Sequence, residues 1–515
     1  MNQINRRTFL KNSASAGGML LLTPYLGGSM LTSSNSTQMG YFEHEFGIDD
    51  LLCQLLLEKA LSKGGDFADI YFEHSLENWL SLEDSKVNRS YSNVLLGVGI
   101  RTVKGDQIGY GFTQELTKES MLSAAATAAS LVNEAASPVA KNLNSLKTQN
   151  YYPFDPSMIE IPLQSKLPLL KAVNDRCFAL SSLIVKVNAG FHDSTKRILV
   201  VTSDGVKAED ILPRNFLYVS TVGEKDGRTE QSWYNFGGRR DFSYYTDELA
   251  TKLSEEVVGR TEKLFEATQP PAGEMPVVLG PGVTGILLHE AIGHGMEADF
   301  NRKNISTFST MIGKKVAESF VTIIDDATNL NQMGSINVDD EGVPGQKTVL
   351  VENGILTGYL HDKISARHYG VEPTGNGRRQ SFEHFPQPRM RNTYMLGGDE
   401  TSEDVIKAAK NGIYIEDVSN GQVKIGEGDF AFYVSQGRMI EDGKLTAPIK
   451  DVNIMGNGPK MLENIIMVAN DLKLDEGGAG SCGKGGQSVP VSFGLPTCLV
   501  KSMTVGGTQQ KGGAS

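Results

Sequence analysis

The chain is poor in cysteine, with four residues scattered over 515 positions. So few and so widely spaced cysteines exclude the disulfide framework of a small secreted domain. No Cys-x-x-Cys pair is present, so a thiol redox enzyme has no support in the sequence. A cysteine in this chain is therefore expected to be a free thiol or a metal ligand. The four are Cys53, Cys177, Cys482 and Cys498.

Positive charge is also scarce. Lys and Arg number 49 against 61 Asp and Glu, which gives a net charge of -12. Non-specific binding to nucleic acid depends on neutralising phosphates, so this balance opposes it. We expect no nucleic-acid partner.

Long apolar runs are missing too. The one apolar stretch near the start, residues 18–22, ends at Thr23 and Pro24, far short of the roughly 20 residues that span a membrane. It follows a paired-arginine block at Arg6 and Arg7, which resembles a twin-arginine export signal. Residues 1–39 are accordingly predicted to be an export signal and linker without a stable membrane anchor, and the mature protein to be periplasmic.

The remaining chain is long enough for two or more domains, and its 56 glycines indicate many turns and strands. We predict an α+β fold, with a mixed N-terminal domain of antiparallel sheet and helices over residues 40–268. A Pro-Pro-Ala-Gly break near residue 270 starts a predominantly β, barrel-like catalytic domain, residues 269–515. Helices are expected at residues 48–61, 118–136, 247–264 and 402–411, and strands at 68–72, 94–100, 108–112, 197–203, 216–222, 348–351, 423–425 and 430–434.

The motif HEAIGH, residues 289–294, follows a buried-strand pattern and a short helical stretch. Its histidines are five apart, and on a regular α-helix such positions differ by about 140° around the axis, too far to hold one ion. Gly293 and Gly295 bracket His294 and can distort the helix, and a π-bulge inserts such an extra residue. His289 and His294 are therefore candidate metal ligands on a short metal-binding helix.

Two imidazoles leave a tetrahedral zinc ion in need of a third protein ligand. Glu297 and Asp299 are candidates because they are near in sequence, although surface roles suit them equally. Cys482 is the third candidate, since it lies in a glycine-dense stretch, residues 477–487, whose backbone can approach another element closely. The residues alone leave this choice open.

Taken together, these stretches resemble the TldD/PmbA family of metalloproteases, in its metal-binding TldD branch. The resemblance is dense over residues 275–500 and looser before them. It is carried by HEAIGHGMEAD at 289–299, DDEG at 339–342, TGNGRR at 374–379, PRMRNTY at 388–394, NDL at 470–472, SCGK at 481–484 and QSVPV at 487–491. The chain departs from the pattern at Arg391, where the family commonly has threonine, and in its export signal.

The resemblance implies zinc held by His289, His294 and Cys482, with Glu290 as the general base. It also makes Gln487 and residues 389–393 candidate neighbours of a substrate, although bracing of glycine-rich loops is an equal alternative. The expected function is a zinc-dependent peptidase that acts on peptides or unfolded protein segments. The resemblance further implies an enclosed site in a homodimer, or in a heterodimer with a metal-free paralogue.

One alternative is a non-catalytic partner subunit of a proteolytic complex, in which zinc only fastens the Cys482 loop to the helix. Structural zinc sites are closed by four protein ligands. Direct ligation by Glu297 would therefore favour this alternative.

Overall fold

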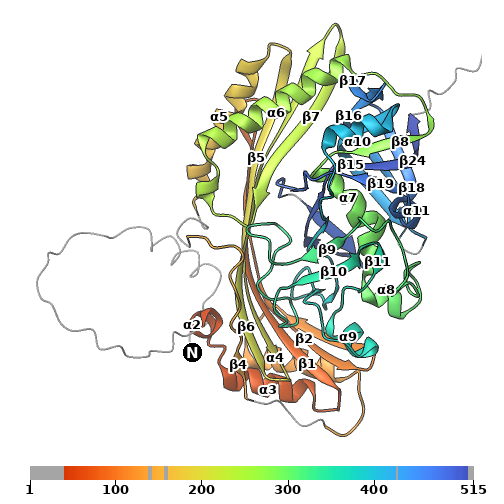
Figure 1. Cartoon of the computed structure of the whole chain (residues 1–515). Coiled ribbons are helices and arrows are strands. Elements are labelled where there is room, and N and C mark those ends of the chain that lie inside the picture. Colours follow the sequence, from red (N-terminus) through yellow and green to blue (C-terminus); the bar gives the residue numbers. More distant parts are fainter. Residues whose placement is uncertain (1–39, 137–141, 156–160, 425–426, 479, 508–515) are drawn as a thin grey trace, which may run out of the picture.

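The computed structural model describes residues 40–136, 142–155, 161–424, 427–478 and 480–507. The predicted export signal, residues 1–39, lies outside this part of the chain. The architecture is α+β, as predicted, with a tall N-terminal sheet beside a β-rich C-terminal half (Figure 1). Over the described residues, no helix combines the length and the apolar character needed to cross a membrane.

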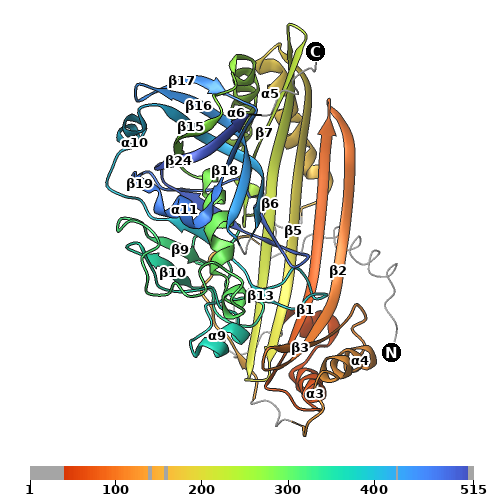
Figure 2. The same cartoon turned by 90° about the vertical axis from the view of Figure 1, so that its right-hand side faces the viewer.

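The N-terminal sheet is one continuous sheet of seven strands in the order β3-β2-β1-β5-β6-β4, with β7 beside β6. Apart from the short parallel pair of β4 and β6, its neighbours are antiparallel. The longest strand has 20 residues, about 65 Å at 3.3 Å per residue, so the long strands run the height of the molecule (Figure 2). The strands are β1 (Phe67–Glu83), β2 (Lys86–Lys104), β3 (Gln107–Thr113), β4 (Asn144–Ser145), β5 (Ile184–Thr202), β6 (Val206–Lys225) and β7 (Arg228–Gly238).

Alternation along β1 explains how this sheet is covered on both faces. Ile70 and Phe72 pack with the helices at the lower end, and Leu80 and Leu82 pack with those at the upper end. Tyr71, between Ile70 and Phe72, points the other way and packs with residues of the C-terminal half. The helices are α2 (Tyr41–Phe46), α3 (Asp50–Ala60) and α4 (Lys118–Ala129) below, and α5 (Leu163–Leu180) and α6 (Asp247–Glu266) above.

One predicted helix was too long. The alanine-rich segment predicted as helical over residues 118–136 ends at Ala129, because Ser130 takes the C-cap position and its hydroxyl donates to the Thr127 carbonyl. Beyond it, the Glu134 N–H donates to the Lys63 carbonyl at 3.0 Å. A tertiary contact therefore wins over local helix propensity.

The C-terminal half contains the predicted barrel. Five strands follow one another in the order β15-β8-β24-β18-β16, and an additional pairing of β16 with β15 closes the ring. Only β8 and β15 run parallel. The five strands are β8 (Gly273–Leu279), β15 (Gly412–Lys424), β16 (Asp429–Glu441), β18 (Val452–Asn457) and β24 (Cys498–Gly507), with β17 (Lys444–Ile449) and β19 (Ile465–Val468) at the side.

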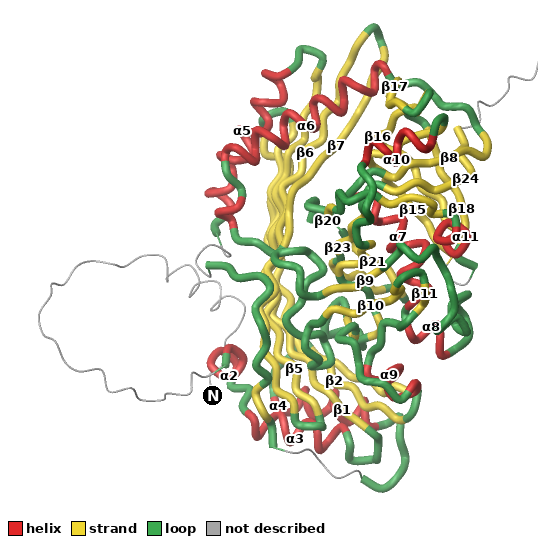
Figure 3. The backbone as a smooth tube through the Cα atoms, viewed as in Figure 1, coloured by secondary structure: helices red, strands yellow, loops and turns green. Residues whose placement is uncertain are grey.

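A second sheet begins beside the barrel at β20 and β23 and continues below it to β9, β10 and β11 (Figure 3). Its order is β11 (Ile355–Leu356), β10 (Lys347–Glu352), β9 (Ile323–Asp326), β14 (Asn392–Met395), β23 (Ser492–Leu495) and β20 (Lys473–Leu474). Two small ribbons accompany it, β12 (Gly377–Arg378) with β13 (Gln387–Pro388), and β21 (Ser481–Lys484) with β22 (Gln487–Pro490). The remaining helices are α7 (Ile286–Leu288), α8 (Ala298–Arg302), α9 (Lys363–Tyr369), α10 (Ser402–Ala409) and α11 (Gly458–Glu463). One hydrophobic core joins barrel, sheet and α7.

Candidate metal centre

The HEAIGH segment forms a π-helical turn. The chain leaves β8 through Gly280, Pro281 and Gly282, enters α7, and then widens into the π-helix His289–Gly293, in which the His294 N–H donates to the His289 carbonyl. A π-turn holds one residue more than an α-turn. The two imidazoles consequently lie on the same side, with ring centroids 5.2 Å apart. The extra residue in the histidine spacing thus matches the extra residue in the turn.

The bracketing glycines act differently from what the sequence indicated. Gly293 has φ -59° and ψ -48°, ordinary helical values, and Gly295 is not among the glycines with positive φ. Both are instead required by close packing, since a Cβ at Gly293 would lie 2.0 Å from Met390 Sδ and one at Gly295 would lie 2.7 Å from Phe308 Cδ2. The glycines make room for neighbours, and the helix distortion does not depend on their conformational freedom.

Cys482 lies close to the two histidines although it is far from them in the sequence. It lies in β21, opposite Val489 of β22, and the hairpin turns at Gly485 and Gly486 with φ of 57° and 75°. The Cys482 side chain is fully buried, and its Sγ lies 3.4 Å from His294 Nε2. One ligand atom from each of His289, His294 and Cys482 lies within 4.8 Å of the others.

Glu297 lies behind His294 and does not join these three ligand atoms. Its Oε2 accepts a hydrogen bond from His294 Nδ1 at 2.9 Å, which leaves Nε2 facing Cys482. A carboxylate in this position fixes the orientation of a metal-binding imidazole and raises its basicity. Lys484 pairs with both Glu297, at 3.0 Å, and Asp299, at 2.7 Å, so neither nearby carboxylate belongs to the converging set.

The charges around the site favour the ionised form of the Cys482 thiol. Burial raises the pKa of the Cys482 thiol, but the charges of His289 and His294 outweigh burial and hold it well below its usual range. Burial lowers the pKa of His294, yet Glu297 and Cys482 raise it well above its usual value. Burial opposes ionisation of Glu297 as well, and Lys484, His294 and Arg389 together lower its pKa to about 2. A thiolate stabilised by adjacent cationic groups is the form in which cysteine binds metals.

The residues fit a zinc ion by an independent observation. Both ring nitrogens of His289 are buried and have no hydrogen-bond partner, although buried polar atoms are nearly always paired. A metal ion bound to one of these nitrogens would give that buried atom a partner. Zinc is commonly held by imidazole nitrogen and thiolate sulfur together.

Glu290 lies on the same side of His294 as Cys482, near the Nε2 atom. Its Oε2 is 3.8 Å from His294 Nε2, and its side chain is 21% exposed, compared with 3% for His294. It is thus beside the converging atoms and open to solvent. A carboxylate so placed can exchange protons with a substrate or a water molecule at the site.

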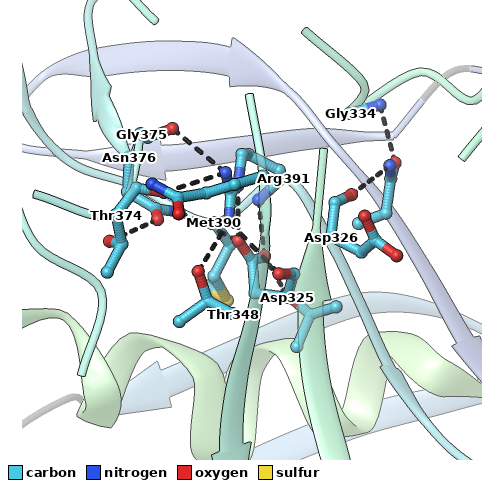
Figure 4. A network of polar contacts seen from close by, with 12 residues as sticks. Asp325, Asp326, Gly334, Thr348, Thr374, Gly375, Asn376, Met390 and Arg391 are labelled. Atoms are coloured by element: carbon cyan, nitrogen blue, oxygen red, sulfur yellow. Dashed lines mark hydrogen bonds and ion pairs between the residues drawn. The ribbon is translucent and has the colours of Figure 1, made fainter. Parts of the chain in front are cut away.

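The arginine-containing segment 389–393 braces the site from outside it. Arg391 donates to both carboxylate oxygens of Asp325, through its backbone N–H at 2.8 Å and its Nε at 2.7 Å, and to the carbonyls of Thr374 and Gly375 (Figure 4). Arg389 donates to the Cys482 carbonyl. Of the two roles left open for residues 389–393, the structure shows bracing.

Gln487, the other residue considered a substrate neighbour, also holds loops together. Its Oε1 accepts from the Gln380 N–H at 3.1 Å, and its Nε2 donates to the Phe385 carbonyl at 3.0 Å.

Sequence reasoning missed the pairing of Lys484 with Glu297, because nothing in the local sequence indicates a contact between positions that far apart.

Comparison with known proteins gives a consistent result. Family models match three stretches: PmbA/TldA metallopeptidase domain 1 at residues 68–132, the central domain at 157–265 and the C-terminal domain at 272–507. A protein named metalloprotease TldD homolog from Buchnera aphidicola is 38% identical over 90% of this chain and 97% of its own length. A metalloprotease TldD homolog from Haemophilus influenzae is 38% identical over 86% of this chain and 93% of its own length. A zinc metalloprotease TldD homolog from Saccharolobus solfataricus is 28% identical over 88% of this chain and 99% of its own length.

Solved structures share the fold. A candidate modulator of DNA gyrase from Thermotoga maritima superimposes with a TM-score of 0.71 at 21% identity, over 85% of this chain and 96% of its own. TldE from Thermococcus kodakarensis superimposes with a TM-score of 0.69 at 18% identity, over 88% of this chain and 100% of its own. At these identities the likeness establishes the fold only.

Proposed function

This chain is a metallopeptidase of the TldD/PmbA family, and we propose that it is a zinc-dependent peptidase whose metal is held by His289, His294 and Cys482. The observation that carries the proposal is the convergence of one atom from each of these residues within 4.8 Å. Zinc in such a set supplies Lewis acidity, which polarises a carbonyl oxygen and lowers the pKa of a water molecule.

Glu290 is the general base in this proposal. It is the acidic side chain nearest to His294 Nε2 on the side of the ligands, at 3.8 Å, and it is partly open to solvent. The carboxylate takes a proton from the attacking water and returns it to the leaving amine, a role that is worth roughly 10²–10⁴-fold in rate. Glu297 is paired with His294 and Lys484, so it orients a ligand.

The non-catalytic alternative, a zinc ion that only fastens the Cys482 hairpin, needs a fourth protein ligand. Within the described residues, the group able to hold a metal here contains three side chains, and Glu297 is committed to the far nitrogen of His294. Three protein ligands with a fourth position for water or substrate is the pattern of catalytic zinc. This favours the peptidase.

We further propose that two subunits enclose the site, as a homodimer or with a metal-free paralogue. The support is an unpaired sheet edge: β2 pairs with β3 over residues 98–104, whereas residues 86–97 have β1 alone beside them among the described strands. Val87 and Val94 on this edge are 52% and 42% exposed. Such an edge invites pairing with a second strand.

The edge gives a direct test of subunit assembly. Val87→Lys together with Val94→Lys places charge on the edge, which is how natural sheets prevent pairing. Analytical ultracentrifugation should show a dimer for the wild type and a monomer for the variant. A wild-type monomer, or a variant that remains dimeric, contradicts this mode of assembly.

The proposed substrates are peptides and unfolded protein segments, since an enclosed site admits flexible chains. An extended peptide can add to a strand edge through backbone hydrogen bonds. The test compares cleavage of one protein in folded and unfolded form by the wild type and by Glu290→Gln. We expect cleavage of the unfolded form alone and at least a hundredfold loss in the variant; equal cleavage of the folded form, or full activity of Glu290→Gln, contradicts the proposal.

We propose a periplasmic location after twin-arginine export, on the basis of Arg6 and Arg7 and the short apolar stretch behind them. Twin-arginine export carries folded proteins, so the metal can be bound before the thiol of Cys482 meets an oxidising compartment. Fractionation of cells that express the wild type or Arg6→Lys/Arg7→Lys tests this. We expect the wild type in the periplasmic fraction and the variant in the cytoplasmic fraction. The same distribution of both proteins between the two fractions would contradict the proposal.

A further inference from the structure

A polar cavity of about 400 Å³ lies between the tall sheet and the C-terminal half. The alternation of β1 creates one wall, because Ile70 and Phe72 face the helices while Glu73, Ser75 and Glu77 face the cavity. The opposite wall includes Ser488 and Pro490 of β22, the two neighbours of the residue that pairs with Cys482. The cavity therefore adjoins the hairpin of the metal centre.

Three arginines that line this cavity lack an acidic partner. None of Arg214, Arg239 and Arg378 forms an ion pair within the part of the chain that the structure describes. Arg378 donates to the carbonyls of Met390 and Pro490 at 2.6 and 2.7 Å, and Arg239 donates to the Pro213 carbonyl at 3.3 Å. Arg239 and Arg378 are 2% and 4% exposed. The Nε atoms of Arg214 and Arg239 are buried and have no hydrogen-bond partner.

The acidic side chains around the cavity are largely engaged elsewhere. Glu73 pairs with Lys196 at 3.1 Å and Glu77 with His192 at 2.8 Å. Asp339 accepts backbone hydrogen bonds from Glu341, Val343 and Gly377, Asp340 accepts one from Arg379, and Glu383 is exposed. The fourth lining guanidinium, Arg379, pairs with Asp69 at 3.1 Å. The charges of Glu77, Asp210 and Asp340 act on the three guanidinium groups, but among the described residues none of these carboxylates forms an ion pair with them.

The like charges act on one another. Burial and the nearby charge of Arg239 together lower the pKa of Arg214 to about 10, although the charge of Glu77 acts in the opposite direction. Burial and Arg239 have the same effect on Arg378, whose pKa also falls to about 10. Unpaired buried charges are costly unless a counter-charge is supplied.

We propose that this cavity binds a small oxyanion, a carboxylate or a phosphate, whose oxygens accept hydrogen bonds from the Nε groups of Arg214 and Arg239. Guanidinium groups match both ligand types because their N–H groups are planar and fixed in direction. The volume is that of a small-molecule site. His289, His294 and Cys482 do not line this cavity, and anion binding in it does not depend on peptidase activity.

Binding is measured on the full metal-loaded protein by isothermal titration calorimetry. Three probes separate the sources of the oxyanion: inorganic phosphate, an N-acetylated dipeptide with a free carboxylate, and the same dipeptide as its amide. Ionic strength is matched with chloride. We expect saturable one-to-one binding of phosphate, of the carboxylate peptide or of both, and none of the amide.

Arg214→Gln is the decisive variant, because Arg214 is only half-buried and its replacement removes repulsion from Arg239. We expect the variant to remain folded and to bind the anion at least tenfold more weakly, while Arg214→Lys, which keeps the charge but loses Nε, is intermediate. The matched control is Arg176→Gln on α5. Arg176 does not line the cavity, and its guanidinium pairs with Asp247 at 2.5 Å. The anion affinity of this variant should equal that of the wild type.

Two results would overturn the proposal. One is the absence of saturable binding of both anions to the wild type. The other is equal affinity in Arg214→Gln and the wild type, which would place the anion elsewhere, for instance at the metal.

Discussion

His294 and Glu297 form the contact that orders the metal centre: Nδ1 of the imidazole donates to Glu297 Oε2 at 2.9 Å, and Nε2 then lies 3.4 Å from Cys482 Sγ. The glutamate is fully buried and is itself held by Lys484. A charge placed behind a ligand in this way tunes both the direction and the basicity of the ring.

Glu297→Gln should weaken zinc binding about tenfold, because an amide can still accept from His294 Nδ1 but no longer carries the charge. Affinity is measured by competition with a chelator. Asp299→Asn is the matched control, since it removes a carboxylate beside Lys484 without touching His294, and its affinity should stay within about twofold of wild type. Unchanged affinity in Glu297→Gln would show that the contact does not tune the ligand.

Gly293→Ala should destabilise the protein by about 1–3 kcal/mol through overpacking. The added Cβ meets Met390 Sδ, whereas the backbone conformation suits alanine. Urea unfolding measures the effect, and the cost should shrink in a Met390→Val background because the two positions are coupled. The control is Gly259→Ala in α6, where a Cβ meets nothing within 4 Å and stability should be equal or higher. A neutral Gly293→Ala would refute the packing explanation.

The convergence of His289, His294 and Cys482 could largely be predicted from the sequence, because its signal is local in two short stretches. The five-residue histidine spacing required a widened turn, and the structure has one. The choice of Cys482 over Glu297 and Asp299 depended on a family resemblance. Both carboxylates are close to the motif in sequence, and nothing in the sequence excluded them as ligands. Their true partner, Lys484, is brought in by the hairpin fold.

Strand extents were less predictable. The pattern at residues 68–72 indicated a short strand, yet β1 continues to Glu83, because its polar residues face a cavity and its apolar ones alternate toward the helices. Alternation with polar groups such as Glu73 and Glu77 looks like a surface segment when the opposite wall of the cavity is unknown. The predicted barrel, in contrast, follows from successive short β-rich runs and turn residues.

Arg391→Lys should cost about 1–3 kcal/mol of stability, the range for buried acceptors left without donors, because lysine keeps the charge but cannot reproduce the donors that Arg391 directs to Asp325, Thr374 and Gly375. The folded fraction should keep its zinc and its KM, since this network lies outside the converging ligands. Unfolding and steady-state kinetics separate the two effects. A raised KM with unchanged stability would return Arg391 to a substrate role.

The free energy of unfolding should fall as pH rises from about 4 to about 7. Burial and the neighbouring Glu341 carboxylate raise the pKa of Asp339 from an ordinary 3.8 to about 7, so in this window the folded protein holds a proton that the unfolded chain has released. The unfolded state then binds fewer protons, and stability decreases with pH.

Asp339→Asn tests this dependence. Its urea-unfolding free energy should vary less over the window, so that the advantage of the wild type is largest near pH 4.5 and smaller near pH 7. The control is Asp226→Asn in an exposed turn, which should track the wild type. Parallel curves for Asp339→Asn and the wild type would exclude Asp339 as the source.

The central claim is tested most directly by zinc content and peptide hydrolysis measured side by side on wild type, Glu290→Gln and Cys482→Ser. The account predicts one zinc per chain and hydrolysis in the wild type, one zinc without hydrolysis in Glu290→Gln, and neither in Cys482→Ser. Full zinc occupancy in Cys482→Ser, or undiminished hydrolysis in either variant, would contradict it.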